Sequence, residues 1–165
     1  MDIKIEIQGL EKAKDIFQEL QNFTDKAYQK RVMTTIGEMT RNKIEESFQD
    51  KKSPFGEAWK PLKQSTIKAK KGIGDILRFS GSLSSRWNIK ATSSSVEVFG
   101  NSVDENSYTY GAVHQFGTNK AGRNKNTKIP KRAFLPIDDN GIIEDGLKDE
   151  IEELLIDELK KAIKD

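Results

Sequence analysis

The chain has 165 residues, of which 33% are charged and 35% hydrophobic, so it fits one domain with a small core and a heavily charged surface. Its formal net charge is only +2, and the absence of cysteine excludes disulfides, thiolate metal ligands and cysteine nucleophiles. No apolar run is long enough to cross a membrane, and the alternating N-terminus is unlike a signal peptide, so we expect a protein made and kept in a cytoplasm, without membrane contact.

Two helices are predicted after a short N-terminal strand. Residues 3–7 alternate apolar and charged side chains, which predicts a half-buried strand. Apolar residues at helical spacing then predict a helix from Leu10 to about residue 22, and Thr24 or Asp25 is suited to cap a second, longer one. The apolar stripe of the second helix indicates core packing, and its members are Val32, Ile36, Met39 or Thr40, Ile44 and Phe48. Gly37 inside that stripe indicates a close helix contact.

An irregular basic segment is predicted over residues 51–75, because prolines and glycines interrupt the helical pattern. Phe55 and Trp59 are large aromatics in an otherwise charged loop, so we expect both to pin the segment to the body of the protein. A short basic helix is predicted from Ser65 or Thr66, followed by another short helix or turn around Gly81.

Strand periodicity begins after Arg86. Alternation predicts strands around residues 87–89 and 96–98, a third over 108–116, and a fourth over 133–137 at a sheet edge. The third strand would place Tyr110, Ala112, His114 and Phe116 on one face. A turn at 138–141 then precedes an amphipathic C-terminal helix. We therefore expect an α+β fold over residues 1–165, in which an antiparallel sheet of about four to five strands packs against N-terminal helices and a C-terminal helix.

The only histidine is His114, and no cluster of metal-ligating side chains surrounds it in the sequence. The serines lack the context of a nucleophile elbow, and no phosphate-binding glycine loop is present. We expect no enzyme activity, no metal and no cofactor. A structural role at a strand end is expected for His114, and a hydrolase centred on it is the least favoured alternative.

Charge is segregated along the chain. Residues 51–132 carry a net charge of +11 and residues 133–165 carry −7. This pattern permits head-to-tail contact between subunits, contact of the basic middle with DNA, or neutralisation within one molecule. Residues 117–132 hold six basic and no acidic residues, which predicts a long, mobile basic arm between two strands. The residues expected to contact a partner are Lys120, Arg123, Lys125, Lys128, Lys131 and Arg132.

Four short motifs occur in a fixed order. They are Pro-Phe-Gly-Glu-Ala-Trp-Lys-Pro-Leu at 54–62, Ile-Leu-Arg-Phe-Ser-Gly-Ser-Leu at 76–83, Tyr-Gly-Ala-Val-His-Gln-Phe-Gly-Thr at 110–118 and Ile-Pro-Lys-Arg-Ala-Phe-Leu-Pro at 129–136. In this order they resemble the Mu-like phage virion morphogenesis (tail completion) family, whose members help to finish tails or join tail to head. The motif residues carrying the resemblance include Phe55, Gly56, Trp59, Gly81, His114, Gln115, Phe116 and Gly117.

The resemblance implies a small α+β connector module that is structural rather than enzymatic. Its implied partners are copies of itself in a ring, other phage tail or neck proteins and, through the basic arm, packaged DNA. Its implied location is the host cytoplasm during assembly and then the tail or neck of the virion. The alternative is a nucleic-acid-binding module that uses the basic middle of the chain, although the aromatic interleaving typical of single-strand binders is missing.

Overall fold

The computed structural model describes residues 8–72, 75–78, 82–85, 87–100 and 110–164. The chain divides into two compact units. Unit 1 comprises Met1–Ile3, Lys43–Trp87 and Gly100–Leu135, and unit 2 comprises Lys4–Asn42, Asn88–Phe99 and Pro136–Asp165. The strand expected at residues 3–7 and the turn residue Gly81 lie outside the described residues.

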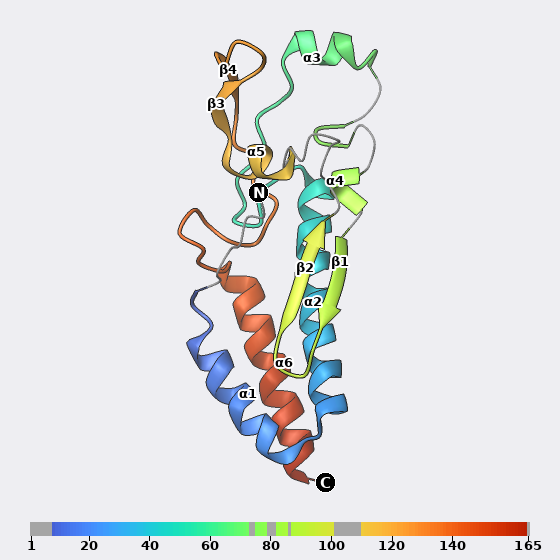
Figure 1. Ribbon diagram of the computed structural model, residues 1–165, viewed down its shortest axis with the longest axis vertical. Coiled ribbons are helices and arrows are strands. Elements are labelled where there is room, and N and C mark those ends of the chain that lie inside the picture. The colour runs from blue at the N-terminus through green and yellow to red at the C-terminus, as the bar shows by residue number, and fades with distance from the viewer. Residues whose placement is uncertain (1–7, 73–74, 79–81, 86, 101–109, 165) are drawn as a thin grey trace. The chain divides into compact units, whose positions relative to one another are not determined.

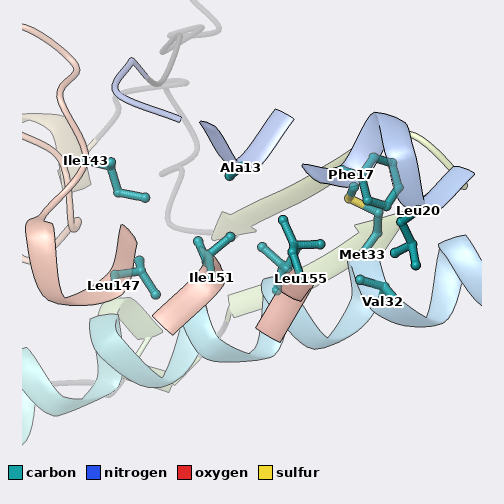
Figure 2. Packing of buried hydrophobic residues seen from close by; sticks show 10 residues of the cluster. Ala13, Phe17, Leu20, Val32, Met33, Ile143, Leu147, Ile151 and Leu155 are labelled. Atoms are coloured by element: carbon teal, nitrogen blue, oxygen red, sulfur yellow. The ribbon is translucent and has the colours of Figure 1, made fainter. Parts of the chain in front are cut away.

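Unit 2 is mainly helical. Helix α1 spans Glu11–Phe23, α6 spans Asp145–Lys164, and the part of α2 (Lys26–Asp50) up to Asn42 also belongs to this unit. Helices α1 and α6 pack against each other (Figure 1). Figure 2 shows the buried apolar side chains gathered between these helices, and the cluster consists of Ala13, Phe17, Leu20, Val32, Met33, Ile36, Ile143, Leu147, Ile151 and Leu155. The predicted N-terminal and C-terminal helices are therefore confirmed.

Capping side chains mark the start of α2 and of α6. The Asp25 carboxylate accepts the backbone N–H of Tyr28 at 2.8 Å, which satisfies one of the free donors at the start of α2. Thr24 does not cap α2, because its hydroxyl donates to the Leu20 carbonyl at 2.7 Å, at the end of α1. The Glu144 carboxylate likewise accepts the N–H of Leu147 at 2.8 Å at the start of α6. Of the two predicted caps for α2, Asp25 is the correct one.

A two-stranded hairpin packs closely on α2. Its strands are β1 (Trp87–Ala91) and β2 (Val96–Gly100), and Figure 1 shows them running antiparallel. A Cβ atom added to Gly37 would lie 2.6 Å from Cγ2 of Ile89 and 2.8 Å from Cγ2 of Val96. Glycine at this position therefore lets the hairpin approach the helix backbone. The predicted close contact at Gly37 is present, and its partner is a strand pair.

The prediction of a single sheet of four to five strands is wrong. The described residues form two separate two-stranded sheets, β1–β2 and β3–β4, where β3 spans Thr118–Ala121 and β4 spans Thr127–Ile129. Residues 110–116, predicted as part of a strand, form helix α5 (Tyr110–Phe116). Gly111 and Gln115 are buried one helical turn apart, so helical spacing decides this segment despite its apolar alternation. The mixed helix and strand class is nevertheless confirmed.

The fourth predicted strand, 133–137, is also absent. The segment is irregular, with bends at Leu135 and Pro136, and its only ladder contact among the described residues is an isolated bridge from Ile137 to Ile143. The backbone N–H groups of Phe134 and Leu135 are taken by the side chain of Gln115 rather than by a neighbouring strand. Two further short helices complete unit 1, α3 (Gln64–Ala69) and α4 (Ser82–Ser85). None of the described helices has the length and hydropathy needed to cross a membrane.

Candidate functional site

Three of the four sequence motifs meet in unit 1. The side chains that join them are Trp59 from the first motif, Gln115 from the third, and Arg132 and Phe134 from the fourth. We call these four residues the motif hub. Each of the three polar members donates or accepts a hydrogen bond with the backbone of another motif or its flank. In the second motif, Gly81 lies outside the described residues.

Trp59 anchors the irregular segment that follows α2. Its side chain is 6% exposed, and its indole Nε1–H donates to the carbonyl of Ala133 at 2.8 Å. The indole also packs edge-to-face on Phe48, with ring centroids 5.3 Å apart, and Phe48 in turn lies 5.2 Å from Phe134. The predicted burial of Trp59 is confirmed.

Phe55 does not share that role. Its side chain is 44% exposed, so the prediction that it also pins the segment is wrong. Phe55 sits in a tight turn, where its N–H donates to the Ser53 hydroxyl at 3.0 Å and Gly56 has a φ of +90°. This backbone conformation, which suits glycine, explains the residue at position 56 without any packing requirement, since a Cβ there would meet nothing within 4 Å.

Gln115 holds the irregular segment after Arg132 in place. Its side chain is 1% exposed, and its single Oε1 atom accepts the backbone N–H groups of both Phe134 and Leu135 at 2.9 Å. An amide oxygen has two lone pairs, so one glutamine satisfies a buried donor at Phe134 and a partly buried one at Leu135. This arrangement replaces the strand pairing that the segment lacks.

Arg132 joins two segments of its own chain. Its side chain is 5% exposed, its Nε donates to the Lys60 carbonyl at 2.8 Å, and its Nη2 donates to the Pro61 carbonyl at 3.2 Å. Its backbone N–H donates to the carbonyl of His114 at 2.8 Å. Burial lowers the pKa of this guanidinium. Arg132 therefore ties the hub to the segment that leads into α3, and its predicted contact with a partner stays a prediction.

Gly117 and Phe116 shape the exit from α5. Gly117 has a φ of +72°, and a Cβ there would lie 2.8 Å from the backbone nitrogen of Lys131. Any side chain at 117 would therefore push apart the two chain segments at the base of the β3–β4 hairpin. Phe116 is an exposed neighbour of this turn.

His114 lies in the last turn of α5 and is only partly accessible to solvent. Burial, and then the positive charges of Arg132 and Lys70, lower its pKa to about 4. The imidazole is therefore neutral at pH 7, which is the form that a structural role near a guanidinium requires. Among the described residues no group of three or more His, Cys, Asp or Glu side chains is arranged to hold a metal ion.

We predict that this histidine makes the fold sensitive to mild acid. The unfolded chain takes up the proton near the ordinary pKa of 6.5, whereas the folded chain resists it down to about 4. The full stability is therefore present above pH 6.5 and is lost as the pH falls toward 4, by at most about 1.4 kcal/mol per pH unit and less where solvent screens the ring. Urea melts of the wild type and His114→Gln across this range test it. Parallel stability curves for the two proteins would contradict it.

The phage virion morphogenesis family matches residues 8–163, which is nearly the whole chain. The chain belongs to the phage virion morphogenesis family. The match spans both compact units and the entire motif hub, so the family relationship includes the helical unit as well as the four motifs. No curated protein and no solved structure matches the chain. The family relationship places the chain in the building of a phage virion.

In this family member, the predicted basic arm is a β-hairpin rather than a long loop. Strands β3 and β4 pair antiparallel, with Thr118 opposite Ile129, and the turn between them is closed by the N–H of Lys125 donating to the Gly122 carbonyl at 3.0 Å. Five of the six predicted contact residues are exposed on or beside this hairpin, and they are Lys120, Arg123, Lys125, Lys128 and Lys131. The mobility of this arm in the free protein stays a prediction.

Proposed function

We propose that the chain is a non-enzymatic structural subunit that completes the tail of a phage or prophage particle or joins tail to head, and that it works as one member of a ring. The family match carries this proposal, because it covers nearly the whole chain and its members act in virion morphogenesis. The subunit assembles in the host cytoplasm and then resides in the tail or neck, among other tail or neck proteins.

The construction of the motif hub supports a structural role. At least one side-chain polar atom of each of Trp59, Gln115 and Arg132 bonds to a backbone group of its own chain. A buried polar network whose members are satisfied in this way makes a region rigid. The motif residues therefore stabilise a defined scaffold, in which the backbone carbonyl of His114 accepts the N–H of Arg132.

The distribution of charge between the units supports self-association. Unit 1 contains 16 Lys and Arg against 8 Asp and Glu, a net charge of +8, whereas unit 2 contains 12 against 18, a net charge of −6. Opposite charges on two parts of one subunit steer copies into head-to-tail encounters. Head-to-tail contacts close into rings where the rotation between subunits allows it.

We therefore predict salt-sensitive self-association. Light scattering should give a mass that rises above the 18.7 kDa of one chain as concentration increases at low salt. Because the Debye length shrinks from about 10 Å at 0.1 M to about 3 Å at 1 M salt, the mass should fall toward the monomer in concentrated salt. A strict monomer at high concentration and low salt, also when tail components are added, would contradict the ring.

A second candidate function, nucleic-acid binding through the basic middle, is favoured by one observation. The exposed cations of unit 1 are nearly all lysines, which suit phosphate contacts better than a dry protein interface. Within a virion subunit the two functions are compatible, since a protein of the tail or neck lies on the path of the packaged DNA.

A further inference from the structure

We propose that two basic segments of unit 1 form one surface that binds the phosphate backbone of double-stranded DNA without reading its sequence. This inference rests on the proposed virion role and names the partner of the β3–β4 hairpin. We call the exposed cations of the two segments the basic surface. Its members are Lys60, Lys63, Lys68 and Lys71 around α3, and Lys120, Arg123, Lys125, Lys128 and Lys131 around the β3–β4 hairpin.

Both segments are fixed to the same point of the fold. The side chain of Arg132 follows β4 by three residues and donates to the carbonyls of Lys60 and Pro61, which precede α3 by only a few residues. Figure 1 shows α3 and the hairpin extending to the same side of α5.

No acidic residue offsets this charge within either segment. The sequence contains no Asp or Glu between Glu57 and Asp75, and none between Glu105 and Asp138. Asp75 lies at the end of the first segment, where it pairs with Lys51 at 2.9 Å, and Lys51 is not part of the basic surface. The nine cations therefore add their fields, which concentrates a polyanion near unit 1.

The composition favours phosphate over an acidic protein face. Eight of the nine cations are lysine, a residue depleted at protein–protein interfaces, where aromatic residues and arginine supply the anchors. Lysine keeps much of its hydration and binds phosphate as a point charge. The exposed neighbours of the hairpin cations are short polar residues such as Asn124, Asn126 and Thr127, which are common contacts to the DNA backbone.

The same composition predicts binding without sequence preference. Neither described segment presents the arginine or amide pairs on a rigid helix that read base edges in the major groove. Helix α3 has only six residues. Of the four cations around it, only Lys68 lies within the helix, and the others flank it. Affinity should therefore come almost entirely from released counterions and should depend steeply on salt.

The test is fluorescence anisotropy with a labelled duplex of about 30 base pairs and mixed sequence, titrated with the full chain at about 50 mM and about 200 mM salt. We expect binding with a Kd in the range of about 10⁻⁶ to 10⁻⁴ M, nearly equal for a second duplex of different sequence, and strongly weakened at the higher salt. A polyglutamate chain of matched charge should compete at least about tenfold less well than unlabelled DNA, because its carboxylates lack the dense phosphate array and its condensed counterions.

A hairpin variant and a matched control locate the surface. The hairpin variant neutralises Lys120, Arg123, Lys125 and Lys128 to Gln, and the control neutralises four exposed lysines of unit 2, Lys14, Lys26, Lys30 and Lys164. Both sets change the net charge by the same amount, and both should keep the wild-type melting curve because the side chains are exposed. The hairpin variant should bind DNA at least about tenfold more weakly. In a plot of the logarithm of the binding constant against the logarithm of the salt concentration, its slope should be smaller in magnitude by about 0.9 for each phosphate that the protein no longer neutralises. The control should bind within about twofold of the wild type.

Each outcome decides the proposal. Absence of binding by the wild-type chain at low salt overturns it, as does an equal loss of affinity in both variants. Unchanged DNA binding by a hairpin variant that no longer self-associates would assign the hairpin to an acidic face of another protein. Loss of DNA binding with normal self-association supports the proposal, and the same variant should then give fewer infectious particles. Failure of DNA binding alone leaves the ring proposal standing, so the two proposals fail separately.

Discussion

Replacing Trp59 by alanine should lower the free energy of unfolding by about 3–5 kcal/mol. The indole is almost fully buried, packs against Phe48, and donates its only N–H to the carbonyl of Ala133. The substitution removes a large apolar volume and leaves a buried carbonyl without this donor. Denaturant melts of the whole chain measure this loss of stability, provided that the dependence of the unfolding free energy on denaturant concentration is compared between the variants.

Two further variants make the result specific. Phe55→Ala removes an exposed ring from the same segment and should cost less than about 0.5 kcal/mol, as exposed substitutions usually do. Trp59→Phe keeps most of the apolar volume but loses the hydrogen bond to Ala133, so its loss should lie between those of the two alanine variants. A loss below about 1 kcal/mol for Trp59→Ala would show that this side chain does not anchor the segment.

Replacing Gln115 by leucine should cost about 2–4 kcal/mol. The substitution keeps a similar volume but removes the oxygen that accepts the N–H groups of Phe134 and Leu135. Leaving a buried donor unsatisfied costs about 1–3 kcal/mol, and here two donors lose the same acceptor. Hydrogen exchange should also become faster at the amides of residues 134 and 135, which connects the energetic loss to these two bonds.

The control for this substitution is Gln49→Leu, at an exposed position near the end of α2. It makes the same chemical change without removing a buried acceptor, so it should alter stability by less than about 0.5 kcal/mol. Equal losses for the two leucine variants would contradict the role assigned to the Gln115 side chain. So would unchanged protection of the amides at 134 and 135.

The long helices could be predicted from the sequence because their signals are local. The apolar stripe of α2 repeats along the helix, and Asp25 caps it through a hydrogen bond to a residue three positions away. Helix α6 combines an apolar stripe with a capping carboxylate at Glu144 in the same way. Trp59 could also be predicted, since a large aromatic in a polar loop has few other means of burial.

The segments around the motif hub could not be predicted, because long-range contacts decide them. The alternation in residues 110–116 fits a strand, and only the burial of Gln115 against Phe134 explains a helix there. Likewise, residues 133–137 have strand-like composition, but a side chain takes their backbone donors. In the sequence, Arg132 is one more cation of a basic run. Nothing near it in sequence indicates that its guanidinium donates hydrogen bonds to carbonyls more than 70 residues away.

The composition of purified virions tests the central claim most directly. Particles of the phage or induced prophage that encodes the chain are purified, disrupted, and analysed by quantitative mass spectrometry after separation of heads from tails. We expect several copies of the chain per particle, in the tail or neck fraction, and particles without completed tails when its gene is removed. Particles that lack the chain, formed at normal yield and infectivity without its gene, would contradict a structural role in the virion.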